Sequence, residues 1–388
     1  MKKLIFILLI SALFMMLTAC NSSQPPVETT TEPIVNQNEP IESLPVTVNE
    51  GSESNDAMQE ITNPGNDEVA NGIGNLSTNV DFTGIVSRHG QLRVEGADII
   101  DQNGNPFQLR GISSHGIHWF PQFINKNAIR ELRDDWNTNV FRLAMYTGED
   151  EGYTAATREQ TWQKVDEGIQ ICIELDMYVI VDWHILQDRT PMLRIDDAIE
   201  FFEYFSQKYG DVPNVIYEIC NEPNPPATWV NDIKPYAEII IPIIRQNAPD
   251  AIIIVGTAQW SQLIEEPLQN PLDVDTANVM YALHFYAATH TDWLRNSLTR
   301  AYQAGLPVFV TEFGMCSASG DGANDYIETE RWLSLLDELN ISYIKWNLSN
   351  KNEASSVLRP HASPTGGWTE DDISESGAWM RNHFRSRG

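Results

Sequence analysis

The sequence has 388 residues and a mass of 43.8 kDa, and its 42% hydrophobic residues and 11 Trp suffice for one large core with aromatic rings to spare. A formal net charge of −29 at pH 7 argues against a nucleic-acid-binding protein, because a phosphate backbone would be repelled by most of the surface. A neutral, extended polymer is a more compatible partner. The acidity otherwise indicates solubility or tolerance of salt.

The N-terminus has the features of an export signal. Lys2 and Lys3 precede an apolar stretch over residues 4–17, which is too short for a comfortable membrane span. The sequence Leu17-Thr18-Ala19-Cys20 follows and resembles the lipobox of bacterial lipoproteins, which implies cleavage before Cys20 and acylation of its thiol. We therefore expect residues 1–20 to be a lipoprotein-type signal peptide, with a plain secretory signal as the alternative. The lipid on Cys20 would then be the only membrane contact of a cell-surface protein. Cleavage of the segment that follows would release the protein.

Residues 21–80 predict a disordered linker. They contain no Lys, Arg or aromatic residue and are rich in Pro, Thr, Ser, Asn and Glu, so they cannot bury enough apolar surface to offset the entropy of ordering. Residues 81–388 then predict one folded domain. Its cysteines, Cys172, Cys220 and Cys316, have no C-x-x-C spacing, so we expect no disulfide and no metal site among them. Cys172 and Cys220 lie in apolar segments and are expected to be buried thiols.

The folded domain alternates apolar runs with amphipathic segments. Strands are predicted at residues 107–112, 140–145, 177–182, 214–219, 251–256, 279–283, 306–310 and 341–346. Helices are predicted between them, at residues 129–136, 162–175, 199–209, 233–244 and 326–339. Eight such strand and helix units predict an α/β fold, the closed (β/α)8 TIM barrel. Ahead of it, residues 92–94 and 98–101 predict a short β-hairpin that closes the barrel floor.

Two carboxylates stand where predicted strands end, Glu222 after the fourth and Glu312 at the seventh. Catalytic groups of such barrels lie at the carboxyl ends of the strands. The fourth and seventh strands face each other across the barrel mouth, so the two carboxyl groups can reach the ~5–5.5 Å separation of a retaining glycosidase. We therefore predict hydrolysis of glycosidic bonds by double displacement, through a covalent glycosyl-enzyme intermediate.

The strand-end motifs resemble those of glycoside hydrolase family 5, and in particular its bacterial endo-β-1,4-glucanases, the cellulases. The resemblance covers residue 82 to the C-terminus and rests on residues 111–116, 142–146, 182–184, 221–224, 283–286, 311–314 and 346–351. It implies that Glu222 is the acid/base and Glu312 the nucleophile, that the substrate is a cellulose-like β-glucan, and that the enzyme is a monomer without a cofactor. Mannan, xyloglucan and mixed-linkage glucan stay open as substrates, because fold and catalytic pair do not specify the polymer. A non-catalytic glycan-binding lipoprotein is the remaining alternative.

Polar residues near the two carboxylates complete the predicted reaction centre. By resemblance, Asn221 bonds the sugar 2-hydroxyl, Tyr286 bonds Glu312 and His284 tunes Glu222. Arg142 lies inside a predicted strand and needs a carboxylate partner; Glu312 is the obvious one, and the pairing should lower the pKa of that carboxyl group. No two histidines have the His-x-x-x-His spacing of zinc hydrolases, so no catalytic metal is predicted.

Further residues are expected to bind sugar units along the chain. By resemblance, Trp346 stacks beneath the cleaved sugar, while Trp119 and Trp260 form platforms on either side, because a glucose face is apolar and lies flat on an indole. Lys351 and Glu353 would bind hydroxyl groups on the non-reducing side. Arg142, Asn221, His284 and Tyr286 also count among the predicted substrate-binding residues, and His115, Tyr146 and His184 complete the set.

Overall fold

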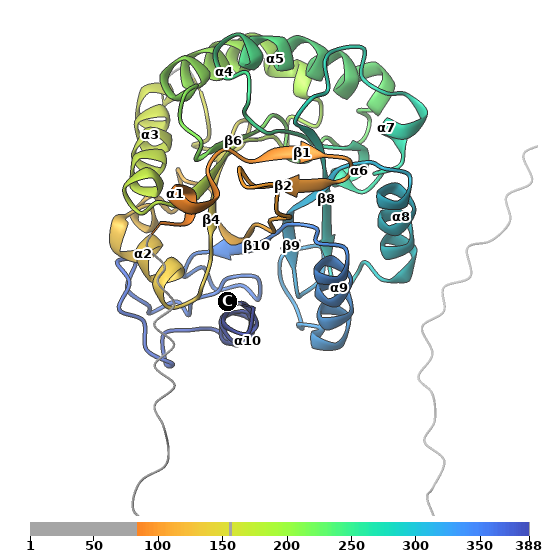
Figure 1. Cartoon of the computed structure of the whole chain (residues 1–388). Coiled ribbons are helices and arrows are strands. Elements are labelled where there is room, and N and C mark those ends of the chain that lie inside the picture. Colours follow the sequence, from red (N-terminus) through yellow and green to blue (C-terminus); the bar gives the residue numbers. More distant parts are fainter. Residues whose placement is uncertain (1–83, 155–156, 388) are drawn as a thin grey trace, which may run out of the picture. The chain divides into compact units, whose positions relative to one another are not determined.

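The computed structural model describes residues 84–154 and 157–387 (Figure 1). The predicted signal peptide, Cys20 and the linker over residues 21–80 lie outside these residues. The centre of the fold is a closed barrel of eight parallel strands, which follow one another in chain order until β10 pairs with β3. The strands are β3 (Arg110–Ser114), β4 (Val140–Tyr146), β5 (Tyr178–His184), β6 (Val215–Glu218), β7 (Ile253–Val255), β8 (Val279–Tyr286), β9 (Val308–Gly314) and β10 (Tyr343–Leu348). All eight predicted strands and the barrel are confirmed.

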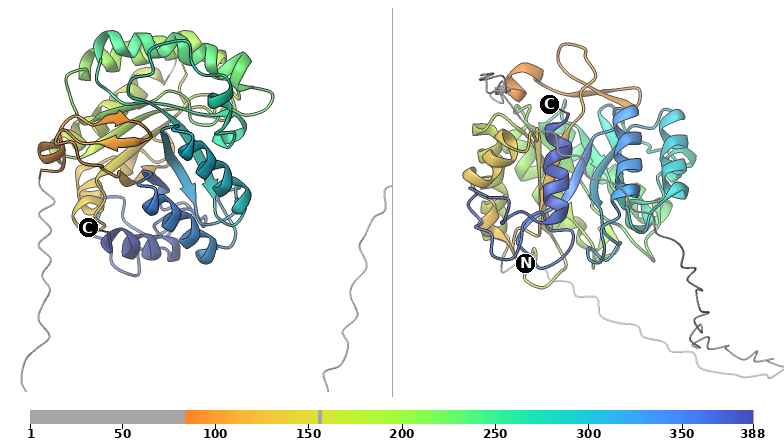
Figure 2. Two further views of the ribbon diagram at one scale, coloured as in Figure 1. Left: turned by 45° about the vertical axis from the view of Figure 1, so that its right-hand side comes forward. Right: turned by 90° about the horizontal axis from the view of Figure 1, so that it is seen from below.

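Helices surround the barrel, as the views in Figure 2 show. They are α2 (Lys126–Asp134), α3 (Arg158–Glu174), α4 (Ile195–Tyr209), α5 (Lys234–Asn247), α6 (Ala258–Ser261), α7 (Glu266–Gln269), α8 (Asp292–Gln303), α9 (Tyr326–Glu338) and α10 (Glu375–Arg385), with short turns η1 (Pro121–Phe123), η2 (Pro191–Arg194) and η3 (Trp229–Ile233). The five helices predicted from the sequence are present within a few residues. In the described part of the chain, no helix combines the length and apolarity needed to cross a bilayer.

The barrel strands are buried on both faces, which explains their continuous apolar sequence. Every residue of β4, β5, β8, β9 and β10 is buried. The surrounding helices approach closely: a Cβ atom on Gly168 of α3 would lie 2.5 Å from a methyl group of Leu143 in β4. The three described cysteines are free and buried; burial was predicted for Cys172 and Cys220.

The N-terminal end of the barrel is covered by a small antiparallel hairpin of β1 (Arg93–Glu95) and β2 (Asp98–Ile100), preceded by α1 (Ile85–His89). The backbone N–H of Val94 donates to Asn278 Oδ1 at 2.8 Å, immediately before β8. The Tyr178 hydroxyl, at the start of β5, donates to the Gly90 carbonyl at 2.7 Å. The predicted hairpin therefore closes the barrel floor, and the opposite end stays open.

Candidate active site

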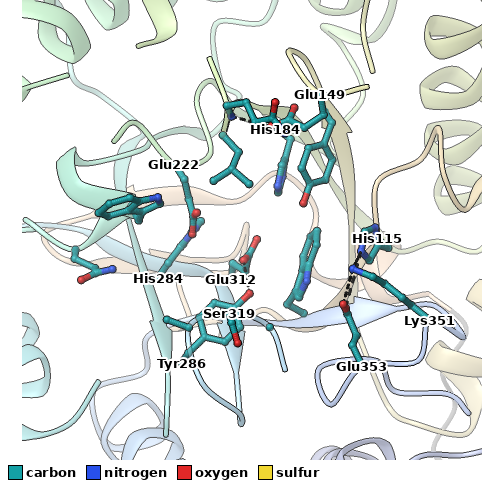
Figure 3. A pocket seen from close by; sticks show the side chains of 18 of the residues that line it. His115, Glu149, His184, Glu222, His284, Tyr286, Glu312, Ser319, Lys351 and Glu353 are labelled. Carbon is teal, nitrogen blue, oxygen red and sulfur yellow. Dashed lines mark hydrogen bonds and ion pairs between the residues drawn. The ribbon is translucent and has the colours of Figure 1, made fainter. Parts of the chain in front are cut away.

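The carboxyl ends of the strands open into a cavity of about 620 Å³ (Figure 3). Twelve of the fourteen residues predicted to be catalytic or substrate-binding line it: His115, Trp119, Tyr146, His184, Glu222, Trp260, His284, Tyr286, Glu312, Trp346, Lys351 and Glu353. Arg142 and Asn221 do not line the cavity; both are buried behind its wall. The barrel thus gathers into one site residues that are more than 200 positions apart in the sequence.

Glu222 and Glu312 approach each other at the centre of this cavity. Glu222 follows β6 and Glu312 belongs to β9, and Figure 3 shows them with His284 beside them. One carboxylate oxygen of each glutamate and one ring nitrogen of His284 all lie within 4.8 Å of one another. Inverting glycosidases separate their carboxyl groups by ~6.5–9.5 Å to admit a water molecule, so this closer pair fits the retaining geometry. The same three residues would be the ligands of any cation that entered; the absence of a catalytic metal stays a prediction.

Glu312 accepts two hydrogen bonds, one from β4 across the barrel and one from the neighbouring strand β8. Arg142 Nη1 donates to Oε2 at 3.2 Å, and the Tyr286 hydroxyl donates to Oε1 at 2.8 Å. A side chain at Gly314 would collide with the Tyr286 ring, because a Cβ atom there would lie 2.1 Å from it. Glycine at this position therefore lets the tyrosine reach the carboxylate.

The pKa of Glu312 is raised rather than lowered. Burial raises it most, the Glu222 charge adds to the effect, and His284, Arg142 and the Tyr286 hydrogen bond oppose it only in part. The expectation of a lowered pKa was therefore wrong in its net direction, although the predicted Arg142 contact is present.

Arg142 is fully buried and binds more carboxylates than the sequence predicted. Its Nε donates to Glu218 Oε2 at 2.7 Å, and its Nη2 lies 3.0 Å from Asp182 Oδ2 and 2.7 Å from Asn221 Oδ1. Although burial opposes the charge of Arg142, Asp182, Glu218 and Glu312 raise its pKa. The prediction of direct substrate binding by Arg142 is corrected accordingly: its guanidinium positions Glu312 and Asn221 from below. Asp182 and Glu218 were missed, although acidic residues inside apolar strands signal such a partner.

Glu222 is bonded to a histidine that carries a proton on both nitrogens. His284 Nδ1 lies 2.8 Å from Glu222 Oε1, and Nε2 lies 2.8 Å from Thr311 Oγ1. The Thr311 hydroxyl itself donates to Glu218 Oε1 at 2.7 Å, so its oxygen accepts from the imidazole. Burial lowers the pKa of His284, but interactions with the Glu218 and Glu222 carboxylates outweigh it and raise the pKa to about 9. His284 thus links Glu222 to the charged layer beneath the cavity.

His184 and Asn221 are fixed in orientation by their neighbours. His184 Nδ1 lies 2.6 Å from Asp182 Oδ2, and Asn221 Nδ2 donates to His184 Nε2 at 3.1 Å and to the Ile185 carbonyl at 3.2 Å. Burial and the Arg142 charge lower the pKa of His184 well below its ordinary value, so the ring is neutral. The predicted bond from Asn221 to a sugar hydroxyl stays a prediction.

One end of the cavity carries a hydrogen-bonded polar cluster beside an indole. Lys351 Nζ lies 2.5 Å from Glu353 Oε2 and 3.4 Å from His115 Nε2. Burial lowers the pKa of His115 to about 4, although Glu353 opposes the shift, so its ring is neutral here. Trp119 is 36% exposed beside this cluster, and Trp346 is nearly buried at the cavity wall, stacked on His184 with ring centroids 5.3 Å apart. These groups form a surface suited to a sugar ring and its hydroxyl groups.

Trp260 stands beside Glu222 on an unusual turn. Gln259, Trp260 and Ser261 all have left-handed backbone angles, with φ between 54° and 56°. The turn is held by a bond from the Trp260 N–H to the Pro223 carbonyl at 3.0 Å and from the Ser261 hydroxyl to the Asn221 carbonyl at 2.7 Å. Left-handed backbone costs roughly 1–2 kcal/mol per residue. This turn is therefore locally strained, and it places a 38% exposed indole next to Glu222.

Several lining residues were missed by sequence reasoning, namely Glu149, Leu186, Gln187, Gln259, Gln262, His290, Ala318, Ser319 and Gly320. They belong to the segments that follow the strands, where no periodic pattern exists to reveal them. Glu149 is the most unusual of them: Oε1 accepts from the Gln187 N–H at 2.8 Å, while its buried Oε2 has no protein partner. Burial raises the pKa of Glu149.

Comparison with known proteins agrees with this geometry. Residues 100–352 match the family Cellulase (glycosyl hydrolase family 5). The chain is 46% identical over 292 residues to an endoglucanase of Clostridium saccharobutylicum, covering 75% of this chain and 64% of the relative. It is 49% identical over 283 residues to endoglucanase A of Evansella cellulosilytica, covering 73% of this chain and 57% of the relative. It therefore spans about three fifths of the length of these relatives.

A solved structure gives the same result. The fold is similar to that of a variant of the catalytic domain of Thermobifida fusca endoglucanase Cel5A in complex with cellotetraose, with a TM-score of 0.74 and 39% identity. The match covers 78% of this chain and 99% of that domain. The barrel, the paired carboxylates at its mouth and these similarities lead to one conclusion: the chain belongs to glycoside hydrolase family 5.

Proposed function

We propose that the protein is a retaining endo-β-1,4-glucanase that cleaves internal bonds of cellulose-like polysaccharides. The observation that carries the proposal is the close approach of Glu222 and Glu312, within 4.8 Å, in a cavity lined by aromatic and polar side chains. The names of the similar endoglucanases and the cellotetraose bound to the Thermobifida domain support a β-1,4-glucan as the substrate.

In the proposed first step, Glu312 attacks the anomeric carbon while Glu222 donates a proton to the departing glycosidic oxygen. The bond from Glu312 to the sugar forms as the bond to the leaving oxygen breaks. Arg142 and Tyr286 support the role of Glu312, because both donate to its carboxylate and so favour the ionised form that attacks. In the second step, Glu222 removes a proton from water, and the water oxygen displaces Glu312.

The role of Glu222 is supported by its contact with His284. An acid/base must gain and lose a proton in each turnover, and a titratable imidazole 2.8 Å away responds to that change of charge. Asn221 bonds Arg142 and His184, which fixes the orientation of its amide, and its assignment to the sugar 2-hydroxyl rests on the family resemblance. A contact to that hydroxyl group would strengthen as positive charge develops on the sugar.

Substrate binding is assigned to the two ends of the cavity. Trp346 would lie beneath the cleaved sugar, Trp119 with Lys351 and Glu353 would bind the non-reducing side, and Trp260 would bind the leaving-group side. Trp260 fits that side because its N–H bonds the carbonyl of Pro223, the residue after the proposed acid. Tyr146, His115 and His184 would complete the wall around the cleaved sugar.

Viscosity loss compared with reducing-end release on carboxymethylcellulose tests the proposal, with barley glucan, mannan and xyloglucan in parallel. Rapid viscosity loss by the wild type and its absence in Glu312→Gln are expected, and proton NMR should show that the first product keeps the β configuration. Activity confined to mannan or xyloglucan would overturn the substrate. An inverted product would overturn the mechanism, and inactivity on every polymer would favour a glycan-binding protein.

We also propose that the protein is exported and anchored through Cys20, with residues 21–80 as the linker to a monomeric enzyme. The support is the sequence of the N-terminus alone. Mass spectrometry of the mature protein should find a diacylated cysteine as the first residue. An unmodified N-terminal residue other than Cys20 would exclude the anchor.

A further inference from the structure

Trp293 is a large exposed side chain with no role in the site described above. It is the second residue of α8 and is 52% exposed. Single exposed apolar residues are common and need no explanation by themselves. The position of Trp293 beside the cavity is the reason to consider a function for it.

The ring of Trp293 packs against a residue that lines the cavity. His290 lines the cavity, and its ring meets that of Trp293 edge to face, with centroids 5.8 Å apart and an interplanar angle of 80°. His290 is itself fixed, because Nδ1 accepts from the Tyr286 N–H at 2.8 Å and its carbonyl accepts from Trp332 Nε1 at 2.7 Å. Trp293 is therefore the next ring outward from a rigid part of the wall.

Trp293 also lies on the side of α8 that meets the Trp260 segment. Residues 293, 297 and 300 share one face of the helix. On that face, the Ser297 hydroxyl and Arg300 Nη2 each donate to Glu265 Oε2 at 2.8 Å, and Glu265 follows Trp260 by five residues. Figure 1 shows α6 and α8 as neighbours. Because α8 starts at the barrel mouth, Trp293 lies nearer to that mouth than Ser297 does.

We propose that Trp293 is a distal sugar-binding platform on the leaving-group side of the cavity, beyond Trp260, and that its ligand is the continuation of the same β-glucan chain. The proposal rests on the proposed function, because it extends the polymer that Glu222 and Glu312 would cut. Three observations support it: an indole open to solvent, its contact with a cavity-lining residue, and its place on the side where Trp260 stands beside the acid. An indole offers a flat apolar face to a sugar ring.

The platform predicts a dependence on chain length. A ligand that ends at the cleaved bond, such as an aryl cellobioside, places no sugar on the leaving-group side and should be insensitive to Trp293. A cellohexaose or a polymer reaches further and should gain from the indole. Loss of one aromatic contact corresponds to about a threefold to tenfold fall in kcat/KM.

The test compares Trp293→Ala with the wild type on cellotetraose, cellopentaose, cellohexaose and p-nitrophenyl cellobioside. Tyr204→Ala is the matched control, because Tyr204 is a 41% exposed aromatic residue on α4 and does not line the cavity. Trp293→Ala should lose kcat/KM increasingly with substrate length, Trp293→Phe should recover most of it, and Tyr204→Ala should change no substrate by more than about twofold. Calorimetry with cellohexaose in a Glu312→Gln background should show the same weakening.

Equal kcat/KM of Trp293→Ala and wild type on every substrate would overturn the platform. A loss as large on the aryl cellobioside as on cellohexaose would also overturn it, because it would indicate a structural effect on the site. Failure of the proposed function is seen separately, in a wild type that cleaves no β-glucan. If the wild type instead cleaves another polymer, the same length series with its oligosaccharides decides the role of Trp293.

Discussion

Arg142 reaches across the inside of the barrel from β4 to place Nη1 3.2 Å from Oε2 of Glu312 at the end of β9. The guanidinium is completely buried, whereas the carboxylate it supports faces the cavity. The planar fork of arginine binds Glu218 and Asn221 with its other nitrogens, so one side chain orients groups at the ends of two strands, β6 and β9.

Replacement of Arg142 by lysine should impair both folding and activity. A lysine ammonium cannot bind Glu218, Asn221 and Glu312 in the same geometry, and a buried carboxylate left unpaired costs about 3–5 kcal/mol. Urea unfolding should show a loss of that order, and kcat should fall at least about 100-fold at temperatures where the variant stays folded. Arg130→Lys on the surface of α2 is the control, with a change below about 0.5 kcal/mol expected. Full activity of Arg142→Lys would contradict the assigned role.

Tyr286→Phe should lower kcat while the shape of the cavity stays the same. It removes the 2.8 Å hydrogen bond to Glu312 Oε1 but keeps the ring, and a bond to a charged group contributes about 1.5–3 kcal/mol, which corresponds to roughly 10- to 100-fold in rate. Because this bond lowers the pKa of Glu312, its loss should raise that pKa further and move the acidic limb of the kcat/KM profile to higher pH. An unchanged acidic limb would show that Glu312 does not control it.

His284 should make stability depend on pH above neutrality. Its folded-state pKa of about 9 exceeds the ordinary value of 6.5, so its contribution is fully present below pH 6.5 and is lost as the pH rises through 9. The stability advantage of the wild type over His284→Gln should therefore shrink by roughly 3 kcal/mol between pH 6.5 and pH 9.5. Urea unfolding at the two pH values measures this. An advantage that grows with pH would contradict a protonated imidazole.

Glu149 should also make stability fall as the pH rises, but in a lower pH range, because it is a buried acid. Burial raises its folded-state pKa above the ordinary value of 4.5, so the stability that the protonated acid supplies is lost as the pH rises. Glu149→Gln keeps the acceptor for the Gln187 N–H, and its melting temperature relative to wild type should increase from pH 4.5 to pH 8. Glu159→Gln on α3 removes the same charge from the surface. If both variants gain equally, overall charge rather than burial of Glu149 is the cause.

The barrel and its reacting pair were predictable from sequence for a simple physical reason. Strands buried on both faces must be continuous apolar runs, and strand ends of such a barrel must meet at one mouth, so Glu222 and Glu312 could be brought together without coordinates. Tyr286 and His284 followed from the family motifs. Their contacts with the two glutamates are those that the resemblance implies.

The rest depended on geometry that only the closed barrel supplies. Glu218 faces Arg142 because of the depth at which both enter the barrel interior, which follows from strand register. The rise in the pKa of Glu312 depends on how completely the closed barrel excludes water, so a nearby arginine alone gave the wrong direction. The left-handed turn at Gln259, Trp260 and Ser261 contains no glycine, so no sequence signal predicts it.

The cross-barrel contacts of Arg142 bear on when the proposed active site is assembled during folding. Its partners come from β3, β5, β6 and β9, so they converge only after most of the chain has been made and β9 has docked. Helices and early strands can form before that event without bringing Glu312 and Arg142 together. After dilution from denaturant, the return of turnover should therefore lag behind the return of helical circular dichroism, because turnover reports the closing of the ring of strands.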